Sequence, residues 1–544
     1  MPEADGTRKS DGAGAPEVRV STPPAITADP TEKRDINEVE RTATLEDGYL
    51  DEKDKQPDYS RMDKEVGKYA SDKRVEISEE KSNELRRLID RRVLVVMVCT
   101  YFLQAIDKGT MSFASIMGIV DDTGLVGQQY SWLTSCIYIA ILIVEYPQNY
   151  IISRVPIGKY LSFMIIGWGT VLACHAACKN FTGLVVVRTL LGIFESACQP
   201  AFLVLGAMWY RREEQASRVT YWYMMNGGQQ IVGGLLAYCF TLIKTGPLKN
   251  WQWLFLTYGI ISVFFGFFVL WWLPDSPMRA KCFTEEQKHL MVERVRDNQT
   301  GLQNKKWKKE HVVDAFKDPQ TYGYAMIALC TTLPTSGLGA FANIIIKNFG
   351  FTTLQTQLLA MVLGVVIIIV LLSSVWMANK WNQNLIVMAA WVIPSYVGTI
   401  LLMTLPDDTK AQSIGLLICY YMTLSFWSAA TLNLTMISRN VGGQTKKGVV
   451  IAVHFVCWSA GNTIGPQVFL SNDGPRYFTA FATHIGCYTA LVLTIGALRW
   501  YLASENKRRD AMAEAGVREA RDEKMIHAFD DLTDRENPNF RYVF

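Results

Sequence analysis

An acidic and a basic residue stand side by side inside a long apolar stretch of the sequence. The stretch 93–117 contains FLQAIDKGTMSFA, with Asp107 and Lys108 near its middle. A helix of about 20 apolar residues spans the hydrocarbon layer of a bilayer, which is roughly 30 Å thick. The two charges are therefore predicted to lie at mid-membrane. A charge at that depth is costly, so each side chain needs a partner or a water-filled cavity.

A second apolar stretch, 184–209, carries a matching set of polar residues. At helical spacing, one face of it is formed by Arg188, Gly192, Glu195 and Gln199. The first stretch has a similar face, formed by Gln104, Lys108, Met111 and Ser115. Two such faces on two helices predict a shared polar cavity.

The buried charges allow two interpretations. In one, Asp107 pairs with Arg188, or Lys108 with Glu195, as a static contact between two helices. In the other, the cations hold an anionic substrate and the acids carry protons, because a carboxyl that gains and loses a cation neighbour can load and release a proton. We favour the second interpretation, since two acids and two bases at one depth exceed what a structural contact needs, and buried ion pairs often add no stability.

The composition divides the chain into a polar part and an apolar part. Of its 544 residues, 49% are apolar and 12% aromatic, and a net charge of +3 gives no reason to expect nucleic-acid binding. Residues 1–90 are rich in charged residues and contain no Trp or Phe, a composition typical of disorder. This tail lacks the pattern of a cleaved secretory signal, so the first spanning helix is expected to direct membrane insertion.

The sequence predicts an all-α membrane protein with twelve transmembrane helices in two six-helix bundles. Apolar windows of roughly 18 to 25 residues lie at 93–117, 131–152, 160–178, 184–209, 221–243, 253–273, 322–346, 355–378, 385–404, 412–437, 449–469 and 478–502. The expected domains are a disordered cytoplasmic tail (1–90), an N-terminal bundle (91–274), a cytoplasmic central loop (275–320), a C-terminal bundle (321–503) and a cytoplasmic C-terminal tail (504–544).

Basic residues in the loops predict the orientation. The loops after even-numbered spans are richer in Lys and Arg than those after odd-numbered spans, which places the even loops and both termini in the cytoplasm. Asn180, in the outer loop between spans three and four, fits a glycosylation acceptor. The alternative is that this loop is too short for the glycosylation machinery to reach.

Chemistry other than transport finds little support in the motifs. The chain has no histidine or cysteine cluster with metal-ligand spacing and no GxSxG motif, so we expect no metal, no cofactor and no enzymatic activity. Cys174 and Cys178 are one helical turn apart and are interpreted as small buried hydrophobes.

Two sets of six spans joined by a long loop resemble the major facilitator superfamily, whose substrate site lies between two related halves. The loop after span two, 146–159, is similar to a cytoplasmic loop signature of that superfamily and keeps Arg154, Gly158 and Lys159. Ser153 replaces its usual Asp, which puts the charge relay of that loop in doubt.

From Arg91 onward the chain resembles a fungal branch of that superfamily, the anion:cation symporters of the allantoate permease family. The resemblance rests on Asp107-Lys108, on Arg188 and Glu195 at their spacing, and on the motifs WLPDSP (272–277), FTEE (283–286), GPQ (465–467) and FDDLTDRENPNFRY (529–542). It implies anion binding by Lys108 and Arg188 and proton coupling by Asp107 and Glu195. Lys108 replaces an Arg of bacterial relatives. Because Lys is a point charge and not a bidentate fork, the site is expected to be less selective for the geometry of the bound carboxylate.

Further residues are candidates for lining the cavity. Gln104 and Gln199 belong to the polar faces, and Asn226 lies in NGGQQIVGG, whose small residues are interpreted mainly as a helix-packing surface. In span eleven, His454, Trp458 and Asn462 share a face; Trp458 suits a flat substrate, and His454 is interpreted as a packing residue. Glu145 is expected to pair with loop bases, and Pro334 is expected to bend span seven.

The expected function is proton-coupled import of a small organic anion across the plasma membrane by a monomer. The resemblance implies substrates of the allantoate, nicotinate, pantothenate or biotin class. Two alternatives stay open: a proton-driven exporter of a metabolite or drug on the same fold, and a nutrient sensor that binds without transporting.

Overall fold

A computed structural model describes residues 77–544, except 153, 245, 296–307, 407–408, 515–531 and 538–539. All of these residues belong to one compact unit, 63–544. The regular structure in this part of the chain is helical throughout and includes no strand. The prediction of an all-α protein is thus confirmed.

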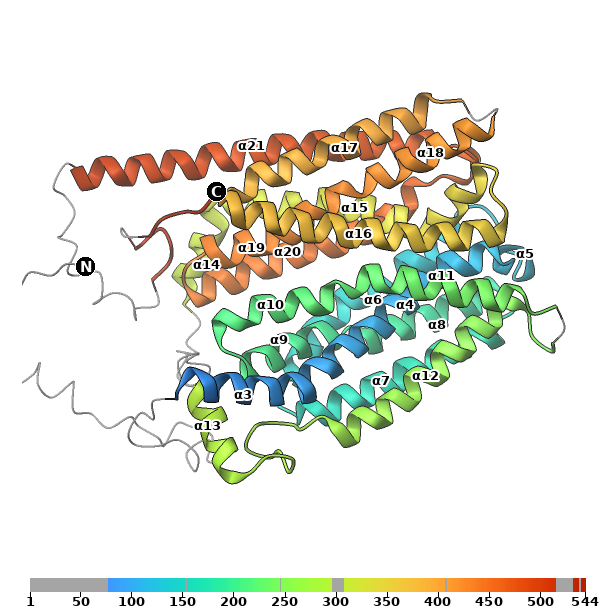
Figure 1. The fold of residues 1–544 in the computed structure, drawn as a ribbon. Helices are drawn as coiled ribbons and strands as arrows, with labels where there is room; N and C mark the ends of the chain where they lie inside the picture. Colours follow the sequence, from blue (N-terminus) through green and yellow to red (C-terminus); the bar gives the residue numbers. More distant parts are fainter. Residues whose placement is uncertain are drawn as a thin grey trace, which may run out of the picture. The chain divides into compact units, whose positions relative to one another are not determined.

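The helices of the N-terminal half run from blue to green in Figure 1. They are α3 (Glu79–Ile89), a π-helical turn (Asp90–Leu94), α4 (Val95–Ile116), α5 (Ile119–Asp122), α6 (Gln129–Ile152), α7 (Ile157–Cys174), a 3-10 turn (His175–Ala177), α8 (Phe181–Glu195), α9 (Cys198–Trp209), α10 (Arg212–Tyr223), α11 (Met225–Thr241), α12 (Asn250–Trp272) and α13 (Glu285–Val295).

The helices of the C-terminal half run from yellow to red in the same view (Figure 1). They are α14 (Lys309–Lys317), α15 (Pro319–Asn348), α16 (Thr353–Trp381), α17 (Asn384–Thr404), α18 (Lys410–Thr423), a 3-10 turn (Leu424–Phe426), α19 (Trp427–Asn440), α20 (Gln444–Ile464), two further 3-10 turns (Gly465–Val468 and Ser471–Asp473) and α21 (Phe478–Glu514).

Ten helical segments in the described part of the chain are long and apolar enough to cross a membrane. They coincide with ten of the twelve predicted spans. The other two predicted spans correspond to α4, which carries Asp107 and Lys108, and to α11, which has only 17 residues and follows α10 after a break at Met224. The count of twelve therefore stays a prediction.

The boundary of the N-terminal tail needs a correction. Residues 1–76 lie outside the described part, but α3 forms within the stretch that we predicted to be disordered. Ser78 caps this helix by accepting a hydrogen bond from the Lys81 amide at 3.3 Å, and Leu85 and Ile89 are buried on one face. Charged residues outnumber the few apolar positions in this stretch, so its composition alone predicted disorder and not a helix.

Close helix packing joins the two halves. α11 of the N-terminal half lies against α16, and α4 lies against α15. A Cβ atom on Gly227 would stand 2.8 Å from the Gly364 carbonyl oxygen, and one on Gly234 would stand 2.7 Å from the Gln357 carbonyl oxygen. The glycines of NGGQQIVGG thus allow α11 to approach α16, as the packing interpretation predicted. Pro334 lies within α15, and the bend expected there stays a prediction.

Two ends of the helical bundle can be named from the elements that lie there (Figure 1). The α13 end holds α3 and α13, joined by a 3.0 Å hydrogen bond from Arg294 Nε to Ser82 Oγ. The α5 end holds α5 and the connection from α15 to α16. Helix α6 starts near the α5 end and finishes toward the α13 end, so later positions on α6 lie nearer α13.

Candidate substrate site

An ion pair joins the two polar faces that the sequence predicted. Lys108 Nζ on α4 lies 2.7 Å from Glu195 Oε1 at the end of α8. The Glu195 side chain is fully buried, whereas that of Lys108 is 29% exposed. Gly192, one turn before Glu195, lets α8 approach α6, because a Cβ atom there would stand 2.7 Å from the Ile137 carbonyl oxygen. The cation is thus reachable from the cavity, and the acid is held behind it.

Asp107 and Arg188 are both buried but form no ion pair with each other. Asp107 Oδ2 accepts a hydrogen bond from Trp168 Nε1 at 2.9 Å, and within the described chain Oδ1 has no hydrogen-bond partner. Arg188 Nε and Nη2 also lack partners there, and the guanidinium carbon lies 5.6 Å from the centre of the Phe255 ring. Of the two static pairs considered from the sequence, only Lys108–Glu195 forms. Within the described residues, Arg188 is thus a buried cation that forms no ion pair.

A pocket lies beside the Lys108–Glu195 pair. It is a small pocket that is partly open to solvent. Its walls come from both halves of the protein and consist of Gln104, Lys108, Ile141, Glu145, Glu195, Ser196, Gln199, Pro200, Phe455 and Trp458. The pocket thus combines charged groups, amides and two aromatic rings at the interface of the bundles.

Three of the further residues that the sequence suggested for the cavity wall, Gln104, Gln199 and Trp458, line this pocket. Gln104 and Gln199 contribute side-chain amides, and Gln104 Oε1 is buried without a hydrogen-bond partner in the described residues. Trp458 lies next to Phe455, with ring centres 5.1 Å apart in a stacked arrangement. These groups can bind a flat or amide-bearing substrate next to the charged pair.

Two other candidates point elsewhere. Asn226 Nδ2 donates to Tyr101 Oη at 3.0 Å and to the Tyr223 carbonyl oxygen at 2.9 Å. Asn462 Nδ2 donates to the Trp458 carbonyl oxygen at 2.8 Å. Neither residue lines the pocket.

Glu145 is a pocket residue that the sequence reasoning missed. We expected it to pair with loop bases, but it lines the pocket, and its Oε2 atom is buried without a hydrogen-bond partner among the residues described. An acid within the apolar run ILIVEYPQ was the available signal. Its place near the end of the span made a loop partner look the better interpretation.

The contact between the halves is closed toward the α5 end. Ser135 Oγ on α6 donates to the Thr463 carbonyl oxygen at 2.7 Å and accepts from Gln467 Nε2 at 2.9 Å. Four further hydrogen bonds cross between the halves: Tyr130 Oη to the Ala340 carbonyl, the Asn343 amide to Ser112 Oγ, Gln357 Nε2 to Thr241 Oγ1, and Ser459 Oγ to the Tyr138 carbonyl. These bonds separate the pocket from the α5 end.

The cytoplasmic loop signature (146–159) and the possible glycosylation acceptor Asn180 make contacts that stabilise the fold. The Lys159 amide donates to Asp275 Oδ1 at 3.2 Å, and a Cβ atom on Gly158 would stand 2.9 Å from the same oxygen. Arg154 lies over the Tyr150 ring at 4.3 Å, while Ser153 lies outside the described residues. Asn180 caps α8 by accepting a hydrogen bond from the Gly183 amide at 2.9 Å, and its glycosylation stays untested.

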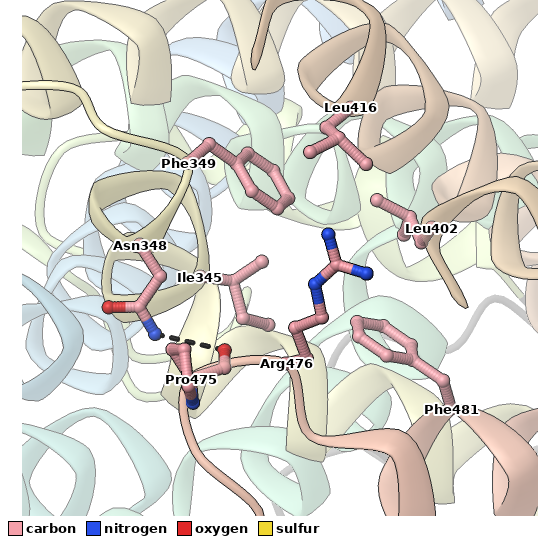
Figure 2. A pocket seen from close by; sticks show the side chains of 8 residues that line it. All are labelled: Ile345, Asn348, Phe349, Leu402, Leu416, Pro475, Arg476 and Phe481. Carbon is pink, nitrogen blue, oxygen red and sulfur yellow. Dashed lines mark hydrogen bonds between the residues drawn. The ribbon is translucent and has the colours of Figure 1, made fainter. Parts of the chain in front are cut away.

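A second pocket, of about 380 Å³, lies at the α5 end of the C-terminal half. Figure 2 shows the Arg476 guanidinium among Phe349, Leu402, Leu416 and Phe481. None of the predicted substrate or proton residues lines it. The pocket beside Lys108 is therefore the candidate substrate site.

Comparison with known proteins agrees with this architecture. The family model described as Major Facilitator Superfamily matches residues 97–466. The allantoate permease of Saccharomyces cerevisiae is 32% identical over 485 residues, covering 87% of this chain and 88% of the permease. The thiamine pathway transporter THI73 of the same yeast is 34% identical over 472 residues, covering 86% and 87%.

Solved structures share the fold at low sequence identity. A bacterial homolog of the human lysosomal transporter Spinster, inward-facing and occupied, has a TM-score of 0.57 at 13% identity and covers 76% of this chain and 96% of its own. A D-xylose-proton symporter has a TM-score of 0.56 at 12% identity, covering 75% and 96%. The chain belongs to the major facilitator superfamily, among the fungal transporters that include allantoate permease, and is a multi-pass membrane transporter and not an enzyme.

Proposed function

We propose that this transporter imports a small organic anion together with protons. The observation that carries the proposal is the Lys108–Glu195 ion pair, 2.7 Å long, in the wall of a pocket between the two halves. At this place, an entering carboxylate can bind Lys108. Glu195, once displaced from Lys108, is then expected to take up a proton.

Competition for Lys108 links the two events. A substrate carboxylate that binds Lys108 displaces Glu195, since a point-charge ammonium shared by two carboxylates holds both more weakly. The displaced Glu195 is buried and loses its counter-ion, so its neutral form becomes the favoured one. Substrate and proton therefore bind together, and departure of the substrate allows Glu195 to return to Lys108 as its proton leaves.

Arg188 supplies the second cation. Its Nε and Nη2 atoms have no partner in the described part of the chain, and Asp107 is held by Trp168 instead of by this guanidinium. In the proposed cycle, Arg188 balances charge behind the pocket while Asp107 acts as the second proton-coupling acid. Two protons accompanying one monoanion would make transport electrogenic.

Within this proposal, the closed α5 end indicates which conformation of the transport cycle the structure represents. With both termini in the cytoplasm, as the loop charges predict, the α13 end is cytoplasmic and the hydrogen bonds around Ser135 close the outer side. The protein would then be inward-facing, the state from which an importer releases its substrate. We place it as a monomer in the plasma membrane.

The relatives support the substrate class. One of them is named allantoate permease, and allantoate is a small organic acid. The tryptophan and phenylalanine rings and the two glutamine amides fit a flat carboxylate with polar substituents. Allantoate, nicotinate, pantothenate and biotin are therefore the compounds to test first.

Uptake of those four radiolabelled acids should be measured in yeast cells that lack their own permeases. We expect uptake of at least one acid, faster at an external pH of about 5 than of about 7.5, because external protons load the carboxyls. Abolition by a protonophore is also expected. Uptake that ignores pH and protonophores, or that depends on sodium, would contradict proton coupling, and efflux without uptake would favour an exporter.

A further inference from the structure

Glu145 is a carboxyl group of the pocket that has no counter-charge among the residues that the structure describes. It lies on α6, two residues before Pro147, and lines the same pocket as Lys108 and Glu195. Its Oε2 atom is buried and has no hydrogen-bond partner, and no cation of the described chain lies within 4.0 Å of the group. The residue as a whole is half-buried, and a carboxylate with one buried oxygen that lacks a partner is stabilised by taking up a proton or by contacting a ligand.

The charges lining the pocket make this need specific. They are Lys108, Glu145 and Glu195. Lys108 and Glu195 neutralise each other at 2.7 Å, so an ionised Glu145 would leave the pocket with one unbalanced negative charge. An anion that enters such a pocket meets a like charge in a poorly screened environment, which opposes binding.

The elements packed around Glu145 offer nothing else to balance it. The helices α4, α8 and α9 bring only Lys108, Glu195 and uncharged residues to the pocket, and α20 brings two aromatic rings. His454 of α20 does not line the pocket; its Nδ1 atom lies 3.3 Å from Asn433 Nδ2 on α19. Asp107 and Arg188 do not line the pocket either.

We propose that Glu145 is a proton-binding residue of the transport cycle, whose neutral form is required for the anion to occupy the pocket. This inference rests on the proposed function. The proton comes from water at the open side and forms an O–H bond on the Glu145 carboxyl as the anion binds. When the anion has left, the proton passes back to water, and the restored negative charge opposes rebinding of the anion. The proton gradient then sets the direction of net transport.

Binding of the anion as a function of pH tests this role. The probe is whichever of allantoate, nicotinate, pantothenate and biotin is taken up, and the protein is the full chain, purified and reconstituted. The slope of log Kd against pH gives the number of protons taken up with the anion. We expect Glu145→Gln to lower this slope by about one, so that the variant binds more tightly than the wild type at alkaline pH, by about tenfold per pH unit.

Two further variants complete the experiment. Glu286→Gln changes an exposed glutamate of α13 and should leave the slope unchanged. Glu145→Asp keeps an ionisable group and should keep the wild-type slope, so it also tests the role if the Gln variant fails to fold. An unchanged slope in Glu145→Gln, loss of binding by folded Glu145→Gln, or a reduced slope in Glu145→Asp overturns the assignment of Glu145. A wild-type slope of zero instead overturns proton coupling itself.

Discussion

Lys446 Nζ lies 2.8 Å from Asp534 Oδ1, which fastens the C-terminal segment onto the start of α20. The same ammonium group lies 2.7 Å from Asp318 and 2.9 Å from Asp314, and the side chains of Lys446, Asp318 and Asp534 are fully buried. Arg509 adds hydrogen bonds to the carbonyl oxygens of this segment. One lysine thus holds together α14, the start of α15 and a segment far along the chain.

Replacing Lys446 by Met should destabilise the protein strongly. The change leaves buried carboxylates without their cation, which typically costs about 3–5 kcal/mol. Asp534→Asn should cost less, about 1–3 kcal/mol, because Lys446 keeps two other carboxylates. Thermal unfolding in detergent measures both effects, and Arg541→Gln, at an exposed pair with Asp510, is the matched control. Equal stability of Lys446→Met and the wild type would show that the cluster does not hold the segment.

Replacing Lys108 or Arg188 by Ala should abolish binding of the anion that the uptake panel identifies. Each change removes a cation and leaves buried acidic groups less well balanced. We expect at least a hundredfold loss of affinity, on the order of 3 kcal/mol, in purified protein that is still folded. Lys380→Ala, at a cation that lies 4.8 Å over the Trp376 ring, is the control. Wild-type affinity in Lys108→Ala would refute the assigned role of this residue.

The hydrogen bonds of Ser135 should stabilise the conformation that is closed at the α5 end. Ser135→Ala removes two bonds between the halves, worth about 1–3 kcal/mol together, and so should shift the conformational equilibrium by about 5- to 150-fold. Spin labels at Val126 and Leu470, one exposed position in each half at the α5 end, report the distance. The fraction of long distances should rise in Ser135→Ala.

The control for that measurement is Ser438→Ala, since Ser438 Oγ donates only to the Thr435 carbonyl of its own helix. An unchanged distance distribution in Ser135→Ala would mean that the closure depends on helix packing, such as that of Gly227 against α16, and not on these bonds.

The sequence predicted the charged core of the site because spacing alone defines a helical face. Arg188, Glu195 and Gln199 recur at helical spacing, and the first span carries Asp107 and Lys108 near its middle. Periodicity does not say whether a polar side chain on a face has already found a partner in its own helix, however. Asn462, for example, donates to the Trp458 carbonyl of its own helix and does not line the pocket.

Other features depend on contacts between distant parts of the chain. The docking of Asp534 onto Lys446 joins segments whose local patterns give no hint of each other, and α3 is short and highly charged. Glu145 was visible as an acid in an apolar run, but only the packing of α6 against α20 shows that it faces the pocket and not the loop.

The Glu195→Gln variant separates a proton carrier from a static ion-pair residue. Gln keeps the shape and hydrogen-bonding capacity of Glu195 but cannot cycle a proton, so the variant should fold and still bind substrate. It should also exchange internal for external substrate, because exchange returns a loaded carrier and needs no proton release. Net uptake against a gradient should fall by at least tenfold, since the empty carrier cannot reset.

A static role for Glu195 predicts a different result for exchange and net uptake. Lys108 would lose the acid that lies 2.7 Å away, and a partly buried cation without that partner should lower thermal stability. Exchange and net uptake would then fall together. Both modes are to be measured in reconstituted vesicles and normalised to the inserted protein, with Glu84→Gln, at an exposed pair with Lys81, as the control. Parallel loss of exchange and uptake would refute Glu195 as a coupling acid, whereas selective loss of net uptake requires that its proton moves during transport.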